Sequence, residues 1–350
     1  MRLTLNRGCV VTGAAVLALL AGSLLSVAQQ AAPKAAVRPG VVPGQGGVHH
    51  QFVSKHFPEL LKEALNGVGV PSLVAVSDFG ASFIDVFDDT NDSLVATLSG
   101  NGLSAPEGMD TDRLGNLYVC NAGNRDILIY AAGFTTAPTS IATNDGQCAN
   151  VAQRNNGAFL GVTMIVGNNG TGGVSFFRNG VEPANGFATD PSILEAFNGD
   201  FDHNGNYYFD GFTQSGTVFV AVIAHATTGG RAIQFLTTNN AIGFPGDVKV
   251  TNGGLITIGD QGTSPNQVYT YNAPSGGSLG TPVDTTVLTG SGDAVTYTFK
   301  VHNHHLYTAD ALNLNSGEWA YPAGGNAENT LSISGASIPI GSAIIPVQIP

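Results

Sequence analysis

Short apolar runs with alternating polar positions recur along most of the chain, and turn residues close each run. Residues 106–133 show the pattern well: a first strand, a turn ending at Gly115, and further strands at 116–120 and 127–130. Alternation over four to eight residues between Gly- and Asn-rich turns predicts β-strands. Related segments lie at 149–177, 198–220, 246–271 and 292–321, and a partial one lies at 73–87.

One landmark sets the period of this repeat. The second strand of each copy ends in an acidic or amide residue, and successive landmarks are 42 to 50 residues apart. The landmarks are Asp78, Asn121, Asn168, Asp210, Asp260 and Asp310. Units of about 40–50 residues built of short strands are typical of propeller blades. We therefore predict an all-β protein with a six-bladed β-propeller over residues 69–350.

The two ends of the repeat region are complementary, because one lacks a strand and the other has a strand without a partner. The first copy has no inner strand before Ser72, whereas residues 333–350 have β-type apolar patterning and no partner of their own. We expect the C-terminal strand to complete the first blade and close the ring, which removes exposed sheet edges. Residues 29–68 are expected to form a flexible tether with one short helix at 58–66, where Leu61 and Leu65 share a face.

The N-terminus has the layout of a secretory signal peptide over residues 1–28. Arg2 and Arg7 precede an apolar run at 9–25, and the small residues Ser26 and Ala28 suit a cleavage site. An uncleaved membrane anchor is the alternative, although the run is short for a span of about 20 residues. We expect a secreted or periplasmic protein with no membrane span after cleavage.

Charge narrows the class of partner. The chain has 350 residues, of which 47 are Gly and only 11% are charged. Residues 68–350 hold seven basic and 23 acidic residues. Such a surface repels phosphate backbones, so we exclude nucleic acid as a partner. It is compatible with a cationic ligand or a metal ion, and we expect a monomer that binds a small molecule or a protein.

Cysteine usage agrees with export. Cys9 lies in the predicted signal peptide, which leaves Cys120 and Cys148 as an even pair. Cys120 ends a second strand and Cys148 begins the next inner strand, so both map to one face of neighbouring blades. We predict a disulfide between them, with two buried thiols as the alternative.

The inner strands begin with acidic or amide residues, and these are our candidate ligand-binding residues. They are Glu107, Asn150, Asn198 with Asp200, Asp247 and Asp293. Propeller geometry places them, together with the landmarks, around one channel mouth. Carboxylates at a narrow opening repel each other unless they are protonated or neutralised by a cation. Hard oxygens suit Ca²⁺ or another divalent metal, although no cofactor is certain. The alternative for the landmarks is turn capping.

Two further motifs are expected to be turns. Residues 200–205 read D-x-D-x-N-G, as at the opening of an EF-hand loop, but position twelve is Gly211 and the flanks are strands. The cluster His302–His305 lies at a predicted hairpin turn, where a Zn or Cu site would be strained. The Walker loop and the H-E-x-x-H motif are missing from the sequence.

Residues 106–133 resemble the repeats of NHL and senescence-marker-protein/gluconolactonase-like six-bladed propellers. The resemblance rests on Pro106–Met109, Asp112, Gly115–Val119, Asn124 and Ile127. Lactonase-like members hold a divalent metal in the channel, and Glu107 takes the position of one Asp ligand. Asn150 and Asn198 are each one residue out of register, and the Trp-flanked motif of the first blade is missing because Trp319 is the only Trp.

Two functions follow from the sequence. The first is an exported, non-catalytic NHL-like propeller that binds a ligand or a protein partner at the acidic channel mouth. The alternative is a metal-dependent hydrolase of the gluconolactonase type. In that case Glu107, Asn198 and Asp247 are the candidate metal ligands, and the ion would polarise a substrate carbonyl. The repeat pattern predicts the fold more directly than the activity.

Overall fold

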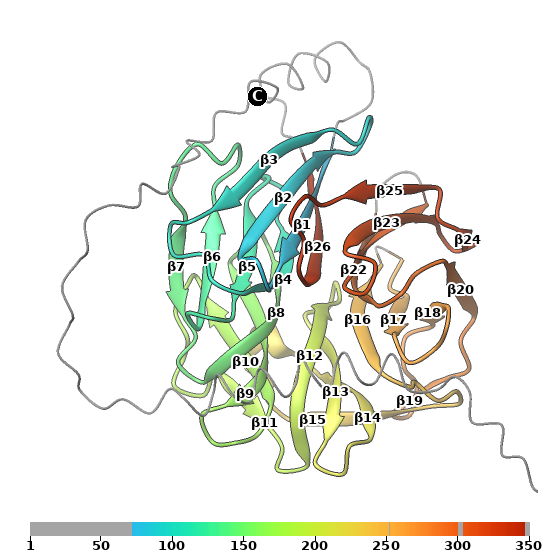
Figure 1. Ribbon diagram of the computed structural model, residues 1–350. Helices are drawn as coiled ribbons and strands as arrows, with labels where there is room; N and C mark the ends of the chain where they lie inside the picture. The colour runs from blue at the N-terminus through green and yellow to red at the C-terminus, as the bar shows by residue number, and fades with distance from the viewer. Residues whose placement is uncertain (1–71, 252, 300–303, 347–350) are drawn as a thin grey trace, which may run out of the picture. The chain divides into compact units, whose positions relative to one another are not determined.

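The computed structural model describes residues 72–251, 253–299 and 304–346. Within these residues six sheets follow one another around a ring, which confirms the predicted six-bladed propeller (Figure 1). The predicted signal peptide, tether and short helix at residues 1–68 lie outside the described residues. We call the strand nearest the ring axis the inner strand, and number the others outward from it.

Each blade is built on a four-stranded antiparallel sheet, whose strands are named from the inner one outward. Blade 1 contains β26 (Pro339–Pro346), β1 (Ser72–Asp78), β2 (Phe83–Asp88) and β3 (Leu94–Ser99). Blade 2 contains β4 (Pro106–Thr111), β5 (Leu117–Asn121), β6 (Asp126–Tyr130) and β7 (Thr139–Ala142). Blade 3 contains β8 (Gly146–Arg154), β9 (Phe159–Gly167), β10 (Gly173–Arg178) and β11 (Phe187–Thr189).

Blades 4 to 6 repeat the arrangement with small additions. Blade 4 contains β12 (Ile193–Phe201), β13 (Tyr207–Thr213), β14 (Val218–Ile223) and β15 (Ile233–Thr238). Blade 5 contains β16 (Pro245–Val250), β17 (Ile256–Asp260), β18 (Asn266–Tyr271) and β20 (Asp284–Thr289). Blade 6 contains β21 (Ala294–Phe299), β22 (His305–Asp310), β23 (Asn315–Ala320) and β25 (Asn329–Ser332). The additions are β19 (Ser278–Gly280) on β15, β24 (Gly325–Asn326) on β20, and a 3-10 turn, η1 (Ala226–Thr228).

The C-terminal strand closes the ring, as the sequence predicts. β26 pairs antiparallel with β1 along its length, from Ser72 opposite Pro346 to Asp78 opposite Pro339. In Figure 1 the red C-terminal strand lies directly beside the blue first strand. The pairing gives β1 the inner neighbour that the first repeat lacks, so that blade 1 has the same four-stranded sheet as the other blades.

Every inner strand carries a β-bulge at about the same height. The pairing with the second strand skips residues 107–108 in β4, 149 in β8, 197–198 in β12, 246–247 in β16, 295–296 in β21 and 340 in β26. A bulge bends a strand and increases its twist. Its recurrence in six blades shows that the bend belongs to the repeat.

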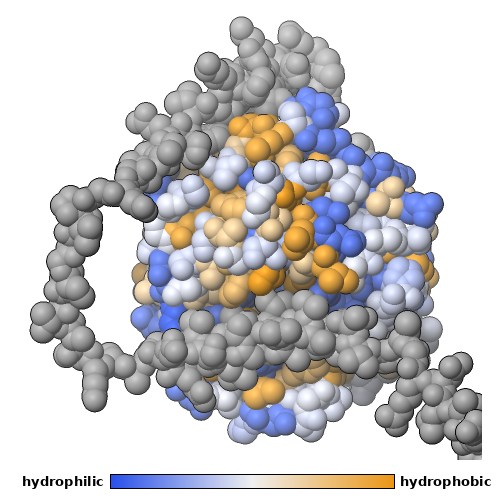
Figure 2. Space-filling model, in the orientation of Figure 1, coloured by the Kyte–Doolittle hydropathy of each residue, from blue (hydrophilic) through white to orange (hydrophobic). Residues whose placement is uncertain are grey.

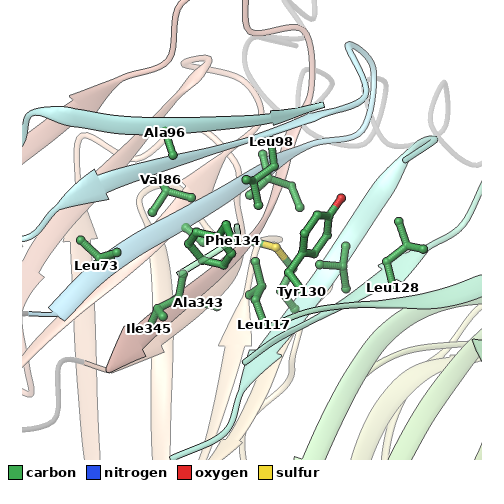
Figure 3. Packing of buried hydrophobic residues seen from close by; sticks show 14 of the residues in the cluster. Leu73, Val86, Ala96, Leu98, Leu117, Leu128, Tyr130, Phe134, Ala343 and Ile345 are labelled. Atoms are coloured by element: carbon green, nitrogen blue, oxygen red, sulfur yellow. The ribbon is translucent and has the colours of Figure 1, made fainter. Parts of the chain in front are cut away.

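The hydrophobic core lies between adjacent blades. In Figure 3 the side chains of Leu73 and Val86 from blade 1 face Leu117 and Tyr130 from blade 2, with Ile345 of β26 beside them. Each blade packs one face of its sheet against each neighbouring blade, so strands such as β1 and β5 are buried on both faces, and this is why a blade is stable only within the ring. Figure 2 shows apolar residues mixed with polar ones on the face in view. Among the described residues, no helix has the length and apolarity to span a membrane.

Candidate functional site on the loop face

We call the face that carries the connections between blades the loop face, and the opposite one the hairpin face. The landmark residues lie at the loop face, where their side chains hold the segment that leads into the inner strand. Asp260 Oδ1 accepts the N–H groups of Gly243 and Phe244, at 3.0 and 3.1 Å. Asp310 likewise accepts the N–H groups of Gly292 and Asp293.

The other four landmarks make equivalent contacts. Asp78 accepts from Ser337 and Ile338, Asn121 from Ser104 and Asp210 from Asn198, while Asn168 donates to the Asn144 carbonyl. A short acidic or amide side chain is suited to this work because it reaches nearby backbone groups without losing much rotamer freedom. The landmark ring is therefore a set of turn caps, the alternative that the sequence left open.

The predicted ligand-binding residues lie in or beside the bulges. Glu107, Asn198 and Asp247 are bulge residues, Asn150 follows the bulge of β8, and Asp293 directly precedes β21. All five are at most 5% exposed, so they lie inside the ring near the loop face and not on open surface.

Three of these residues contact one another across three blades. Asn150 Nδ2 lies 3.5 Å from Asn198 Oδ1 and 3.4 Å from Asp247 Oδ1. The Asn198 side-chain amide in turn donates to the Gly246 carbonyl of the next bulge. Glu107 is nearby in the ring because Gly108 packs so closely on the Asn150 side chain that a Cβ atom would lie 2.5 Å from its Oδ1.

A buried lysine lies below this cluster and was missed by the sequence analysis. Lys249 Nζ is 3.4 Å from Asp247 Oδ2, and the lysine side chain is 13% exposed. Burial alone would lower the pKa of Lys249, but Asp247, Asp200 and Asp110 raise it above its usual value. The two-residue spacing from Asp247 was the available signal, because residues i and i+2 of a strand point the same way.

The candidate residue Asp200 and its counterpart Asp110 connect neighbouring inner strands. Asp200 Oδ2 accepts the Val250 N–H at 2.8 Å, and Asp110 Oδ2 accepts the Gln153 N–H at 2.7 Å. Each carboxyl thereby joins one blade to the next at the ring centre. Burial raises the pKa of both groups, and Lys249 opposes that increase.

Four buried side-chain oxygens near the loop face have no hydrogen-bond partner within the described residues. They are Glu107 Oε1, Asn150 Oδ1, Asp210 Oδ2 and Asp293 Oδ2. Burial raises the pKa of Glu107 and of Asp210 well above the usual range. Burial and then Asp310 raise the pKa of Asp293 to about 7. These groups are acceptors without donors, and a donor or a cation would satisfy them.

Three half-buried phenylalanines stand beside this cluster between blades 4 and 5. The ring centroids of Phe197 and Phe212 are 5.8 Å apart, and Phe244 lies 5.0 Å from Phe212 and 6.2 Å from Phe197. Phe197 directly precedes Asn198, and Phe244 directly precedes β16. We call these residues the aromatic patch. Glu195, opposite Phe212 in the sheet, is partly buried, and burial raises its pKa.

The proposed metal ligands do not form a set of open oxygens. Asp247 accepts the N–H groups of Val248 and Tyr297 and faces Lys249, so its carboxylate is already satisfied. Among the described residues, no three His, Cys, Asp or Glu side chains are grouped closely enough to hold a metal ion. The residues present do not fit a divalent metal, and we derive no chemical step through one.

The predicted disulfide is present. Cys120 of β5 and Cys148 of β8 are bonded, with their Cα atoms 5.8 Å apart. The bond joins the second strand of blade 2 to the inner strand of blade 3, two positions before Asn150. It therefore fixes the backbone that carries one candidate site residue.

The two remaining motifs are placed differently. Asp202 accepts the N–H groups of Asn204 and Asn206 and caps the hairpin between β12 and β13, as expected for a turn. His302 and Asn303 lie outside the described residues. His305 begins β22, with its Nδ1 3.3 Å from Glu318 and its Nε2 2.9 Å from Glu328.

Comparison with known proteins supports the fold and leaves the activity open. No protein-family profile and no curated protein matches the chain. A chain of a nidogen/laminin complex has a TM-score of 0.61 at 13% identity, over 79% of this chain and 99% of that one. A Bacteroides caccae protein of unknown function has 0.59 at 14% identity, with the same coverage. Kuenenia stuttgartiensis hydrazine synthase has 0.51 at 12%, over 70% and 72%. These identities establish the propeller fold alone.

Proposed function

We propose that this protein is an exported, non-catalytic binding propeller that holds a cationic group of a small molecule or a protein partner at its loop face. The observation that carries the proposal is the set of four unpartnered buried oxygens near the loop face, together with the aromatic patch next to Asn198. Carboxyl and amide oxygens attract positive charge, and phenylalanine faces attract cations as well. The excess of acidic over basic residues in the domain favours the same sign of ligand.

Protonation supports the choice of a cation. Burial raises the pKa values of Glu107 and Asp210, and burial with Asp310 raises that of Asp293, so these carboxyls hold protons more strongly than exposed ones. An arriving cation favours the ionised carboxylates and releases protons. Binding should therefore strengthen as the pH rises from 6 to 8.

The test uses choline as a compact cation and 3,3-dimethylbutan-1-ol as its neutral counterpart of the same shape. Choline should raise the melting temperature in a saturable way, since a ligand stabilises the state that it binds, and the alcohol should not. Phe212→Leu and Asp210→Asn should weaken the response to choline. Phe235→Leu, at an exposed phenylalanine outside the patch, is the matched control and should leave it unchanged.

If choline and the alcohol raise the melting temperature equally, the site does not select for positive charge and the electrostatic part of the proposal is wrong. If neither changes the melting temperature, the proposed site does not exist. The second candidate, a gluconolactonase-type hydrolase, is disfavoured by the commitment of Asp247 to Lys249. Melting curves and a lactonase assay test this candidate. Stabilisation by Ca²⁺ that a chelator reverses, together with lactone hydrolysis that is lost in Glu107→Gln, would replace our proposal by the hydrolase.

A further inference from the structure

A cavity lies on the hairpin face of the ring, between blades 3 and 4. Its volume is about 360 Å³, within the usual range of small-molecule pockets. Phe159 begins β9 and Phe201 ends β12, next to the hairpins that join first and second strands. The cavity therefore opens on the hairpin face, away from the cluster around Asn150.

The walls of the cavity are aromatic. Phe176, Phe177 and Phe201 line it, and each is less than a tenth exposed. Phe176 packs edge-on against Tyr207 at 5.4 Å and lies 6.2 Å from Phe201, so these rings are held in place by the core of blade 4. A rigid apolar wall of this kind accepts a flat apolar body without large rearrangement.

Two arginines lie over the aromatic walls. The Arg178 guanidinium is 5.0 Å from the ring centroid of Phe159, and that of Arg231 is 4.5 Å from the centroid of Phe176. Arg178 also donates to the Thr227 carbonyl at 3.0 Å, and Arg231 Nε to the Asn185 carbonyl at 2.8 Å. Stacking and backbone bonds thus fix both guanidiniums at the cavity with N–H groups to spare.

Neither guanidinium has a carboxylate partner within ion-pair distance among the described residues. Glu182 lies near Arg231 and raises the pKa of that guanidinium, while burial and then Asp145 raise the pKa of Glu182 to about 8. Burial has the larger effect on Arg231 and lowers its pKa. A guanidinium that is held against an aromatic wall without an ion pair can accept an anion through its remaining N–H groups.

We propose that this cavity binds a small amphiphilic anion. Its apolar or aromatic body would occupy the phenylalanine-lined space, and its carboxylate, sulfonate or phosphate group would contact Arg178 and Arg231. The site is independent of the loop-face proposal, because it uses other residues, another face and the opposite ligand charge. It is unexpected in so acidic a domain, and the local gathering of arginines identifies it.

The experiment uses 8-anilinonaphthalene-1-sulfonate as the probe and N-phenyl-1-naphthylamine, with the same rings and no sulfonate, as its neutral counterpart. The full-length protein should bind the sulfonate in a saturable way with one molecule per chain. Arg178→Gln should weaken its binding by about tenfold, the worth of a charge-assisted hydrogen bond, and leave the amine nearly unaffected. Arg231→Gln should act in the same direction.

The matched control is Arg125→Gln, which removes the same charge on the loop face, where Arg125 contacts Asn168. It should leave both probes unchanged. Arg231 also holds the η1 segment, so the melting temperature of Arg231→Gln is measured as well. If that temperature shifts, the proposal is judged on Arg178→Gln, because the Arg178 side chain is exposed. The proposal is overturned by the absence of saturable binding, by equal losses for the two probes, or by an equal loss in Arg125→Gln. One probe per two chains would assign the cavity to an interface between copies and also overturn it.

Discussion

At the residue scale, the polar side chains of the ring centre act mainly on backbone groups. In three blades a hydroxyl side chain near the bulge donates to a backbone carbonyl of the next blade. Ser77 donates to Glu107, Thr163 to Phe197 and Thr296 to Ile340. Inner strands of neighbouring blades do not pair as sheets, so these bonds replace a ladder. The acidic composition of the centre is in part a structural requirement, and only groups left over after this role are candidates for ligands.

Asp293 is one such group and gives a pH prediction. Its pKa is about 7 in the folded protein, against 3.8 for the ordinary side chain, because burial and Asp310 disfavour its charge. The folded state thus holds the proton more strongly, and the stability that Asp293 contributes is present below pH 4 and lost as the pH rises toward 7. Asp293→Asn should therefore raise the melting temperature, relative to wild type, progressively from pH 4 to pH 8.

Asp190→Asn is the control with the opposite sign. Hydrogen bonds from Ser192 lower the pKa of Asp190, so its contribution is lost only in acid and the variant should not gain stability as the pH rises. Melting curves at pH intervals of one unit measure both. A difference between Asp293→Asn and wild type that is constant from pH 4 to 8 would contradict the raised pKa. At pH 7–8 a gain of a few degrees is expected, since ~1 kcal/mol corresponds to about 2–4 °C for a domain of this size.

At the element scale, the bulge explains which parts of the site the sequence could and could not predict. The strands of blade 2 follow the expected positions closely. β8 and β12, however, begin at Gly146 and Ile193, well before Asn150 and Asn198. A bulge breaks the two-residue alternation, so the apolar pattern before it reads as a loop. The candidate residues were still identified, because acidic and amide residues at the bend can be recognised in the sequence even when the predicted start of the strand is wrong.

The disulfide between β5 and β8 gives an element-scale prediction. It closes a loop with a sequence separation of 28 residues, for which the loop-entropy relation gives about 3–4 kcal/mol. The double variant Cys120→Ala with Cys148→Ala should unfold at lower denaturant concentration with a similar denaturant slope. A reducing agent should lower the stability of wild type to that of the double variant and leave the double variant unchanged. Equal stability of oxidised and reduced wild type would show that the cross-blade bond adds nothing.

At the scale of the whole molecule, the ring was predictable because each repeat contains the same local feature. The landmark Asp or Asn recurs because the loop that enters every inner strand needs a cap. Counting these caps in the sequence predicted the number of blades. The aromatic patch and the hairpin-face cavity were not predictable. Each joins residues from different blades, and Arg178 and Arg231 are 53 positions apart in sequence. Such contacts depend on the closure and twist of the ring.

Closure itself gives the last prediction. β26 buries Ala343, Ile344 and Ile345 and supplies the inner partner of β1. A chain that ends after Ile338 should lose the monomeric fold, because blade 1 then exposes an unpaired inner edge and apolar side chains on both faces. A chain that ends after Pro346 keeps β26 and is the matched control, with the elution volume, circular dichroism and melting temperature of wild type. A synthetic peptide of residues 336–346 should restore the fold of the shorter chain, since strand addition needs no covalent link. A monomeric shorter chain that melts like wild type would show that the remaining five blades hold the ring without this strand.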